Sequence, residues 1–367
     1  MGLCAQPSVR SSARHPGMMR RVASAHRPQR TIRATAPIRV CDNGGWTDTW
    51  FARHGKVFNI GVSPGAEVEI RAYPLGALPD RVVLDVANYR DRYAFGPSSL
   101  PGRHPLLEAV IDAVGLPHES CVEVVVRSAA PPGSSTGTSA SVAVALLGGL
   151  DALTPGGMDR VAVAAAAHRI ETEALGVESG VQDQLCAAFG GINFIDVSPY
   201  PEARVSQLEL PDRAWNALEG QLLLVYLGAA HVSSEMHEQV ITAIGRQSAH
   251  AEHVLDELRG AAEESRDAVL AADLPALGRA MRRNTDAQAS LHPGLVGDDA
   301  SAAIEVARAS GALGWKVNGA GGEGGSITIL SGDGPAARHE LVAALLALNP
   351  RFEHLPTTLD RSGLRVW

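Results

Sequence analysis

The segment PPGSSTGTSASVAVALLGGL, Pro131 to Leu150, places a turn rich in glycine and hydroxyl side chains directly before an apolar helix. Gly133 and Gly137 let the backbone expose successive N–H groups, and the dipole of the following helix points its positive end at the same place. The turn therefore predicts a phosphate site, although an N-capping turn before a buried helix remains an alternative. Three hydroxyls are placed to contact phosphate or a Mg²⁺ ion, those of Thr138, Ser139 and Ser141. The sequence contains no GxxxxGK[ST] pattern, which excludes a P-loop.

Two further segments have unusual glycine content. Ala36 to Val62 reads as a strand, a turn and a second strand, and it contains GGWTDT at Gly44 to Thr49. Lys316 to Leu330, KVNGAGGEGGSITIL, has five glycines between two strands, a density that a hairpin turn does not need. Because phosphates repel a carboxylate, we expect the side chain of Glu323 in this loop to point outward.

Taken in their order along the chain, the three segments resemble the motifs of the GHMP kinases. This superfamily includes galactokinase, homoserine kinase, mevalonate kinase and phosphomevalonate kinase. The turn at 131–141 is similar to the second motif, PxGxGLGSSAA, from which Ser135, Thr136 and Thr138 depart. KVNGAGGEGG is similar to the third motif, KLxGAGGGGF. GGWTDT followed by HGKVFN resembles the L-fucokinases, and FGGINFI at 189–195 resembles the D-glycero-D-manno-heptose 7-phosphate kinases. The resemblance is thus to the sugar-kinase branch, more distantly to galactokinase, and it covers roughly Arg33 to Leu330.

The resemblance implies an α+β protein with the two-domain GHMP kinase fold. We expect an N-terminal α+β domain that binds ATP over 31–205, a C-terminal ferredoxin-like α+β domain over 206–367, and the active site between them. Residues 1–30 are rich in Arg and Ser and contain no Asp or Glu. That composition is typical of an organellar transit peptide. We expect instead either a disordered tail or a sequence that begins upstream of the real start codon, at Met18 or Met19.

The resemblance also implies a role for individual residues. Asp183 is matched to the catalytic carboxylate that accepts the hydroxyl proton, and Arg39 to an arginine that keeps it ionised. Ser139 and Glu171 are matched to the ligands of Mg²⁺. The substrate-binding residues are then Gly44, Gly45, Trp46, Thr47 and Asp48. The ATP-binding residues are Pro132, Gly133, Ser134, Ser135, Gly137, Thr138, Ser139, Gly319, Gly321 and Gly322. Without the resemblance, Glu171 is a solvated helix carboxylate and Asp183 a first-turn residue favoured by the helix dipole.

Composition agrees with an enzyme that acts on a small molecule. The chain has 367 residues, 45% of them hydrophobic, which is enough for a large core. A net charge of −8 argues against a nucleic-acid partner, and no apolar run is long enough to span a membrane. Cys4, Cys41, Cys121 and Cys186 lack metal-binding spacing, so we expect free thiols and a cytoplasmic protein. The sequence does not determine the oligomeric state, a homodimer included.

Periodicity gives a coarse order of elements. It predicts a β-rich segment from Arg33 to about Val86, then alternating helices and strands up to Tyr226. The polar segment PDRAWNALEG, 211–220, predicts a connection close to the domain boundary near residue 205. Helices are expected at 233–259, 261–272, 275–289, 298–310 and 336–348.

The activity that the resemblance implies is transfer of the ATP γ-phosphoryl group to a sugar hydroxyl. Galactokinase, fucokinase and the heptose kinase all phosphorylate the anomeric hydroxyl, so a sugar 1-phosphate, from a fucose-like hexose, is expected. Asp48 would repel a nearby phosphate, and His231 replaces an arginine of the heptose kinases, which together favour an unphosphorylated sugar. The alternatives are a heptose 7-phosphate 1-kinase, a kinase of a non-sugar alcohol and a catalytically silent sensor of sugar and ATP. A dinucleotide oxidoreductase is disfavoured, since no βαβ pattern accompanies the glycines.

Overall fold

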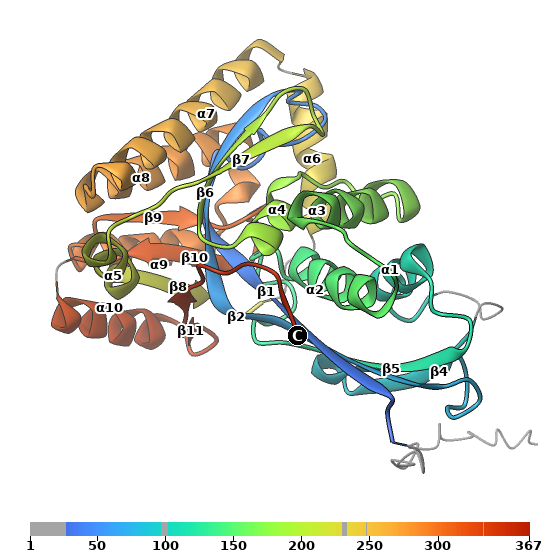
Figure 1. Ribbon diagram of the computed structural model, residues 1–367. Coiled ribbons are helices and arrows are strands. Elements are labelled where there is room, and N and C mark those ends of the chain that lie inside the picture. The colour runs from blue at the N-terminus through green and yellow to red at the C-terminus, as the bar shows by residue number, and fades with distance from the viewer. Residues whose placement is uncertain (1–26, 97–101, 230–232, 247, 333) are drawn as a thin grey trace, which may run out of the picture.

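The computed structural model describes residues 27–96, 102–229, 233–246, 248–332 and 334–367. Within these ranges two β-sheets are covered by helices, and Figure 1 shows the long strands β1 and β2 running from one part of the molecule into the other. This is the α+β, two-domain arrangement that the sequence predicts. Residues 1–26 and His231 lie outside the described residues.

The larger sheet has the order β13-β1-β2-β5-β3-β4, and β6, β7 and β12 extend it from β2. Only β3 and β5 pair in parallel among the described strands. The first half of β2 pairs with β6 and its second half with β5. The strands are β1 (Arg30–Asn43), β2 (Gly55–Pro74), β3 (Val82–Val86), β4 (Asp91–Phe95), β5 (Ser120–Ser128), β6 (Ile192–Val197), β7 (Ala203–Gln207), β12 (Thr358–Leu359) and β13 (Arg365–Val366).

Helix α2 (Thr138–Leu153) is the centre of the N-terminal half. Its residues from Ala143 to Leu150 are all buried, because it packs against β1 and β2 on one side and against neighbouring helices on the other. The apolar run after the glycine turn is therefore a core helix, as its composition predicts. Around it lie α1 (Pro105–Val114), α3 (Arg160–Arg169), the π-helical turn η2 (Ile170–Ala174) and α4 (Gln182–Phe189).

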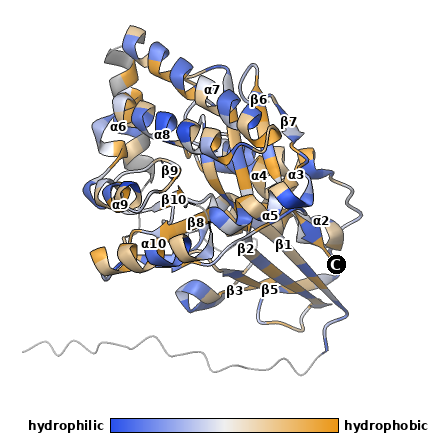
Figure 2. Ribbon diagram, turned by 90° about the vertical axis from the view of Figure 1, so that its left-hand side faces the viewer, coloured by the Kyte–Doolittle hydropathy of each residue, from blue (hydrophilic) through white to orange (hydrophobic). Residues whose placement is uncertain are grey.

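The second sheet is antiparallel, in the order β11-β8-β10-β9. Helices α7 and α8 pack closely against each other, and both also contact the first sheet. On these helices Figure 2 shows hydrophilic and hydrophobic residues in alternation. The elements are α5 (Asp212–Gln221), β8 (Leu222–Tyr226), α6 (Ser233–Arg246), α7 (Ser248–Leu270), α8 (Leu274–Leu291), α9 (Asp298–Ala309), β9 (Gly314–Val317), β10 (Ser326–Leu330), α10 (Pro335–Leu348) and β11 (Glu353–Leu355), with short 3₁₀ turns η1 (Ala87–Tyr89) and η3 (Pro293–Leu295).

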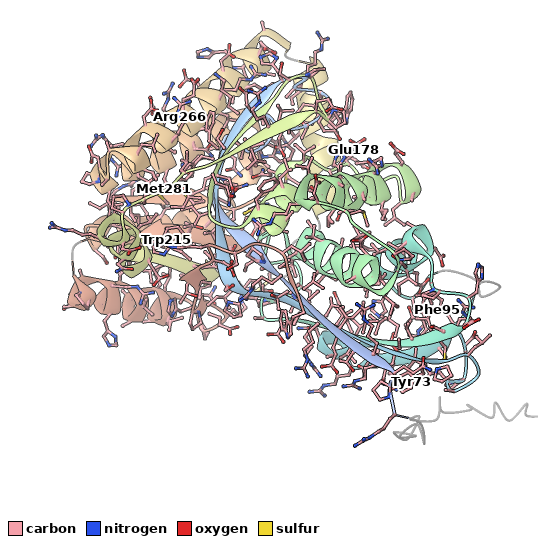
Figure 3. All side chains as sticks on the ribbon, viewed as in Figure 1. Tyr73, Phe95, Glu178, Trp215, Arg266 and Met281 are labelled. Carbon is pink, nitrogen blue, oxygen red and sulfur yellow. The ribbon has the colours of Figure 1, made fainter. Side chains whose placement is uncertain are left out.

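One hydrophobic cluster joins the two sheets. It contains Phe58 of β2, Trp215 of α5, Leu224 of β8 and Met281 of α8. Trp215 and Met281 are labelled in Figure 3, where they lie beside the long strands. Because a packed interior resists rearrangement, this cluster fixes how the elements of the two sheets meet.

The structure corrects two details of the predicted element order. The segment 211–220, expected to be a polar connection, contains helix α5, whose Trp215 and Leu218 are buried. The helix break expected near Gly260 is absent, and α7 runs through it, since Ala261 and Ala262 are fully buried and their packing outweighs the helix propensity of one glycine.

The domain boundary near residue 205 stays a prediction. That residue lies within β7, and the C-terminal strands β12 and β13 return to pair with β2 and β1. Cys41, Cys121 and Cys186 are free and buried. No described helix combines the length and the apolar character that crossing a membrane needs.

Candidate active site

The loop before α2 owes its shape to three residues with positive φ. Gly133, Ser135 and Gly137 have φ values of 71°, 58° and 68°. At Gly137 a side chain would also be crowded, because a Cβ there would lie 3.0 Å from the carboxylate carbon of Asp183. Glycine at this position thus lets the backbone approach the Asp183 carboxylate closely.

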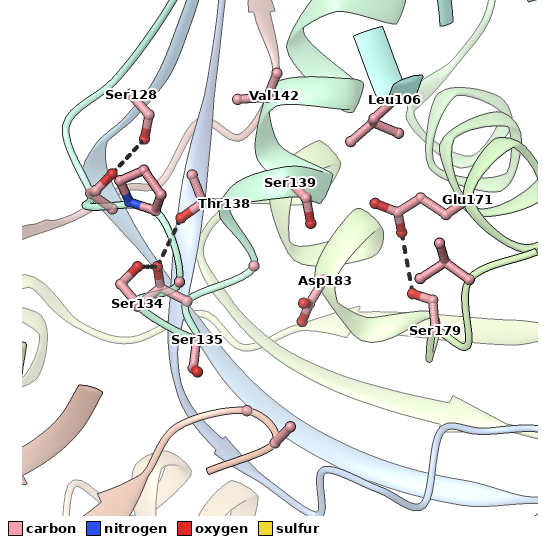
Figure 4. Close-up of a pocket in the computed structure, with 18 of the residues that line it drawn as sticks. Leu106, Ser128, Ser134, Ser135, Thr138, Ser139, Val142, Glu171, Ser179 and Asp183 are labelled. Atoms are coloured by element: carbon pink, nitrogen blue, oxygen red, sulfur yellow. Dashed lines mark hydrogen bonds between the residues drawn. The ribbon is translucent and has the colours of Figure 1, made fainter. Parts of the chain in front are cut away.

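The hydroxyls of this loop divide into two groups. Those of Ser134, Thr136 and Thr138 form a hydrogen-bonded chain, with oxygen separations of 2.8 and 3.1 Å (Figure 4). Ser141 is fully buried and donates to the carbonyl of Ala36 over 2.7 Å, so the prediction that it contacts phosphate or metal is wrong. Thr138 and Ser139 both line the pocket.

Arg39 of β1 and Asp183 of α4 form a salt bridge at the centre of the site. Nε of Arg39 donates to Oδ1 of Asp183 over 2.8 Å, and Nη2 to Oδ2 over 3.3 Å. Nη1 donates to the carbonyl of Ser135, which ties the loop to the same guanidinium. Burial disfavours the charge of Arg39, but the attraction of Asp183 and Asp42 outweighs it and raises the pKa of Arg39. The structure therefore brings together the two residues that the sequence assigns to catalysis.

Glu171 lies in the π-helical turn η2, and such turns occur frequently at functional sites. Its carboxylate accepts hydrogen bonds from Gln184, Ser179 and Ser139. Burial, and then the charge of Asp183, raises the pKa of Glu171 to about 7. Figure 4 shows Ser139, Glu171 and Asp183 around one space.

These oxygens fit a Mg²⁺ ion. The described residues contain no cluster of three or more His, Cys, Asp or Glu side chains suited to a metal. Mg²⁺ beside phosphates, however, needs only one or two protein ligands and completes its octahedron with phosphate oxygens and water. A hydroxyl and a carboxylate within hydrogen-bonding reach of each other, Ser139 and Glu171, provide such a pair.

Asp48 reaches the start of α4 from the turn after β1. Its Oδ2 accepts the backbone N–H of Gln182 over 3.0 Å, and it lies against Gly180, where a Cβ would come within 2.1 Å of it. Burial raises the pKa of Asp48 to about 6. Asp48 and Trp46 line the pocket. Thr47 is fully buried, and its hydroxyl holds the turn by bonding to the carbonyl of Gly44 over 2.7 Å.

The third glycine segment meets the first two at Gly319. A Cβ on Gly319, whose φ is 58°, would lie 3.0 Å from the carbonyl oxygen of Ser135 and 3.1 Å from Nη2 of Arg39. Gly319 lines the pocket, whereas Gly321 and Gly322 are buried and do not line it. Glu323 is exposed, as its charge predicts.

All three segments border one pocket of about 530 Å³. The predicted residues that line it are Arg39, Trp46, Asp48, Pro132, Gly133, Ser134, Ser135, Gly137, Thr138, Ser139, Glu171, Asp183 and Gly319. Gly44, Gly45, Thr47, Gly321 and Gly322 are not among the lining residues. Sequence reasoning missed an apolar part of the wall, formed by Val86, Tyr89, Leu106, Val126 and Val142 together with Asn88. These residues belong to no motif, and ordinary core periodicity was their only signal.

Comparisons with known proteins agree with this geometry. Residues 105–191 match the model of the GHMP kinases N terminal domain. The chain is 24% identical over 238 residues to the D-glycero-alpha-D-manno-heptose 7-phosphate kinase of Campylobacter jejuni, covering 65% of this chain and 68% of that protein. It is 24% identical over 368 residues to the L-fucokinase/L-fucose-1-P guanylyltransferase of Bacteroides fragilis, covering 90% of this chain but 38% of that protein. It is 29% identical over 223 residues to the mevalonate kinase of Methanothermobacter thermautotrophicus, covering 59% and 69% of the two chains.

The crystal structure of a D-glycero-D-manno-heptose 1-phosphate kinase from Bacteriodes thetaiotaomicron has the same fold. Its TM-score is 0.70 at 20% identity, with 92% of this chain and 98% of that chain covered. The pocket joins a phosphate-type glycine loop, a hydroxyl–carboxylate pair and a buried Arg–Asp pair, a combination that defines a phosphotransferase. These findings show that residues 105–191 match a GHMP kinases N terminal domain and that the chain is similar to kinases of the GHMP superfamily.

The raised pKa of Asp48 predicts a pH-dependent effect of Asp48→Asn on stability. A carboxyl whose pKa moves from 3.8 to about 6 on folding lowers stability wherever it is charged, by about 3 kcal/mol above pH 6. That cost disappears as the pH falls from 6 toward 4. Asp48→Asn, which keeps an acceptor for the Gln182 N–H, should therefore raise the free energy of unfolding at pH 8 and have a smaller effect at pH 5. Urea denaturation at the two pH values measures it, with the exposed Asp112→Asn as control. An equal effect at both pH values would contradict the assignment.

Proposed function

We propose that this GHMP-family kinase transfers the γ-phosphoryl group of ATP to a hydroxyl of an unphosphorylated sugar, the anomeric hydroxyl, to give a sugar 1-phosphate. The observation that carries the proposal is the arrangement in one pocket of the loop before α2, the Ser139–Glu171 pair, the Arg39–Asp183 pair and Asp48. Phosphoryl transfer requires mainly positioning and neutralisation of charge, and the pocket provides groups for both.

We expect ATP to bind with its phosphates at the loop before α2 and its base at the apolar wall. The loop before α2 presents backbone N–H groups and the helix N-terminus, which suit the phosphates. The apolar wall of Val86, Leu106 and Val142 suits the nucleobase, since ligand pockets combine apolar walls with a few placed polar groups. Ser139 and Glu171 would hold Mg²⁺, which when bound offsets charge on the phosphates.

We propose Asp183 as the group that accepts the proton of the acceptor hydroxyl. Its side chain is 26% exposed, whereas Arg39 is 5% exposed, so the carboxylate and not the guanidinium faces the open part of the pocket. Arg39 fixes both oxygens of Asp183 and places a positive charge beside the reacting groups. Asp183 would thus act as general base while Arg39 stabilises negative charge that develops during transfer.

The acceptor end of the pocket is acidic. Asp48, Glu178 and Asp183 line the pocket, whereas its two arginines are paired with carboxylates, Arg39 with Asp183 and Arg103 with Asp91. Carboxylates make strong charge-assisted hydrogen bonds to neutral hydroxyls but repel a phosphate. This balance supports an unphosphorylated hexose or deoxyhexose over a sugar phosphate as the acceptor.

Replacing the general base should slow the chemical step and spare nucleotide binding. We expect Asp183→Asn to lower kcat by about 10² or more, the usual contribution of a general base, with little change in the Kd for ATP. The control is Asp196→Asn, at an exposed position of β6. Steady-state kinetics with the best sugar and a nucleotide titration provide the measurement. Near-normal turnover of the variant would remove Asp183 from the mechanism.

Removing the oxygen ligand of either Ser139 or Glu171 should lower the affinity of the site for Mg²⁺. Glu171→Gln and Ser139→Ala are each expected to raise the Mg²⁺ concentration for half-maximal rate by about tenfold or more, because a ligand of the ion is lost. Thr138→Ala is the matched control, since the Thr138 hydroxyl bonds to Thr136 instead. An unchanged Mg²⁺ dependence in both variants would place the metal elsewhere.

A panel of acceptors tests the choice of substrate. ADP release is measured with free hexoses and deoxyhexoses, with a heptose 7-phosphate and with mevalonate. We expect the highest kcat/KM for a free sugar and a product whose phosphate is labile in mild acid, as an anomeric phosphate is. Preference for the heptose 7-phosphate would overturn the proposed acceptor and leave the kinase assignment standing. ATP binding without turnover of any acceptor would instead indicate a sensor.

A further inference from the structure

A buried ion pair joins the two sheets at the wall of the pocket, which Asp42 lines and Lys316 does not. Lys316 of β9 and Asp42 of β1 are each 1% exposed, and Nζ of Lys316 lies 3.2 Å from Oδ1 of Asp42. Lys316 does not line the pocket, and the proposed mechanism does not use its charge. Burial lowers the pKa of Lys316, and the negative charge of Asp42 opposes that shift. A charged group this deeply buried requires its partner.

The pair is part of a closed ring of contacts. Lys316 donates from Nζ to Oε1 of Gln288 on α8 over 3.0 Å. Nε2 of Gln288 donates to the carbonyl of Gly319 over 3.2 Å, and the N–H of Gly319 donates to Oδ2 of Asp42 over 3.0 Å. The ring therefore holds both backbone polar groups of Gly319 and connects β1, α8 and β9.

Gly319 is the place where the third glycine segment reaches the phosphate loop. A Cβ on Gly319 would make tight contacts with the carbonyl oxygen of Ser135 and the guanidinium of Arg39, and its positive φ disfavours a side chain as well. Asp42 also lies 4.0 Å from Nη2 of Arg39. A small shift of the ring would thus move Gly319 and change the electrostatic surroundings of Arg39.

We propose that Asp42, Lys316 and Gln288 are positioning residues that hold Gly319 at the phosphate end of the pocket, so that nucleotide affinity depends on a buried ion pair. This inference rests on the proposed function, because it takes Gly319 to border the bound nucleotide. A ring with only a structural role would stabilise the fold where the two sheets meet, but it would not change the affinity for the nucleotide.

The test compares two ring variants with a matched control. Lys316→Met removes the buried ammonium, and Gln288→Met removes two hydrogen bonds while leaving the ion pair intact. Thr285→Val is the control, since Thr285 lies one turn before Gln288 on α8, is also buried, and bonds to the carbonyl of Trp315 in β9 outside the ring. Calorimetry measures the Kd of the non-hydrolysable analogue AMPPNP with Mg²⁺, and thermal melting measures stability.

We expect both ring variants to weaken AMPPNP binding by about fivefold or more, the factor that loss of one hydrogen bond gives, while the control stays within about twofold. All three variants should melt at lower temperature than the native protein. If the ring variants melt at a lower temperature but bind AMPPNP with native affinity, the inference is overturned and the kinase assignment is left intact. If the native protein itself fails to bind AMPPNP, the proposed function is wrong and the inference fails with it.

Discussion

The buried guanidinium of Arg39 is the constraint on which the rest of the site depends. A charge removed from water must be paired and hydrogen-bonded, and Arg39 finds its partners in three separate segments. It donates to Asp183 at the start of α4 and to the Ser135 carbonyl in the phosphate loop, and it lies beside Asp42. Because these groups come so close, a Cβ at Gly137 or Gly319 would make tight contacts with them, and both glycines have positive φ.

Around this cation the site gathers more negative than positive charge. Glu171 and Asp48 are buried, with pKa values raised to about 7 and about 6, and burial is the first cause in each case. Their hydrogen bonds do not fully offset the cost of burial, and carboxyl groups with such raised pKa values cluster at functional sites. A divalent cation at Glu171 and sugar hydroxyls at Asp48 are the partners that these two environments would favour.

The sequence was sufficient for what depends on local chemistry. The glycine turns and the buried helix α2 were predicted from φ-permissive residues and an apolar run, whereas the meeting of Arg39 with Asp183 was implied by the family resemblance. It was insufficient where partners lie far apart along the chain. Nothing around Asp42 or Ser141 indicates that Asp42 pairs with Lys316, or that Ser141 bonds to the carbonyl of Ala36. The helix α5 was missed because only two buried residues, Trp215 and Leu218, distinguish it from a polar connection.

The ring of Asp42, Lys316, Gln288 and Gly319 and the hydrophobic cluster around Phe58 lead to the same physical conclusion about the pocket. Both join elements of the two sheets, one by buried polar contacts and the other by packed apolar side chains. Contacts of these two kinds are formed by the protein alone, before any nucleotide arrives. The end of the pocket that we propose for the phosphates is therefore organised in advance, and binding energy need not be used to assemble it. The end that we propose for the acceptor is lined by carboxylates instead, so the free energy gained there would depend on which hydroxyls the acceptor offers.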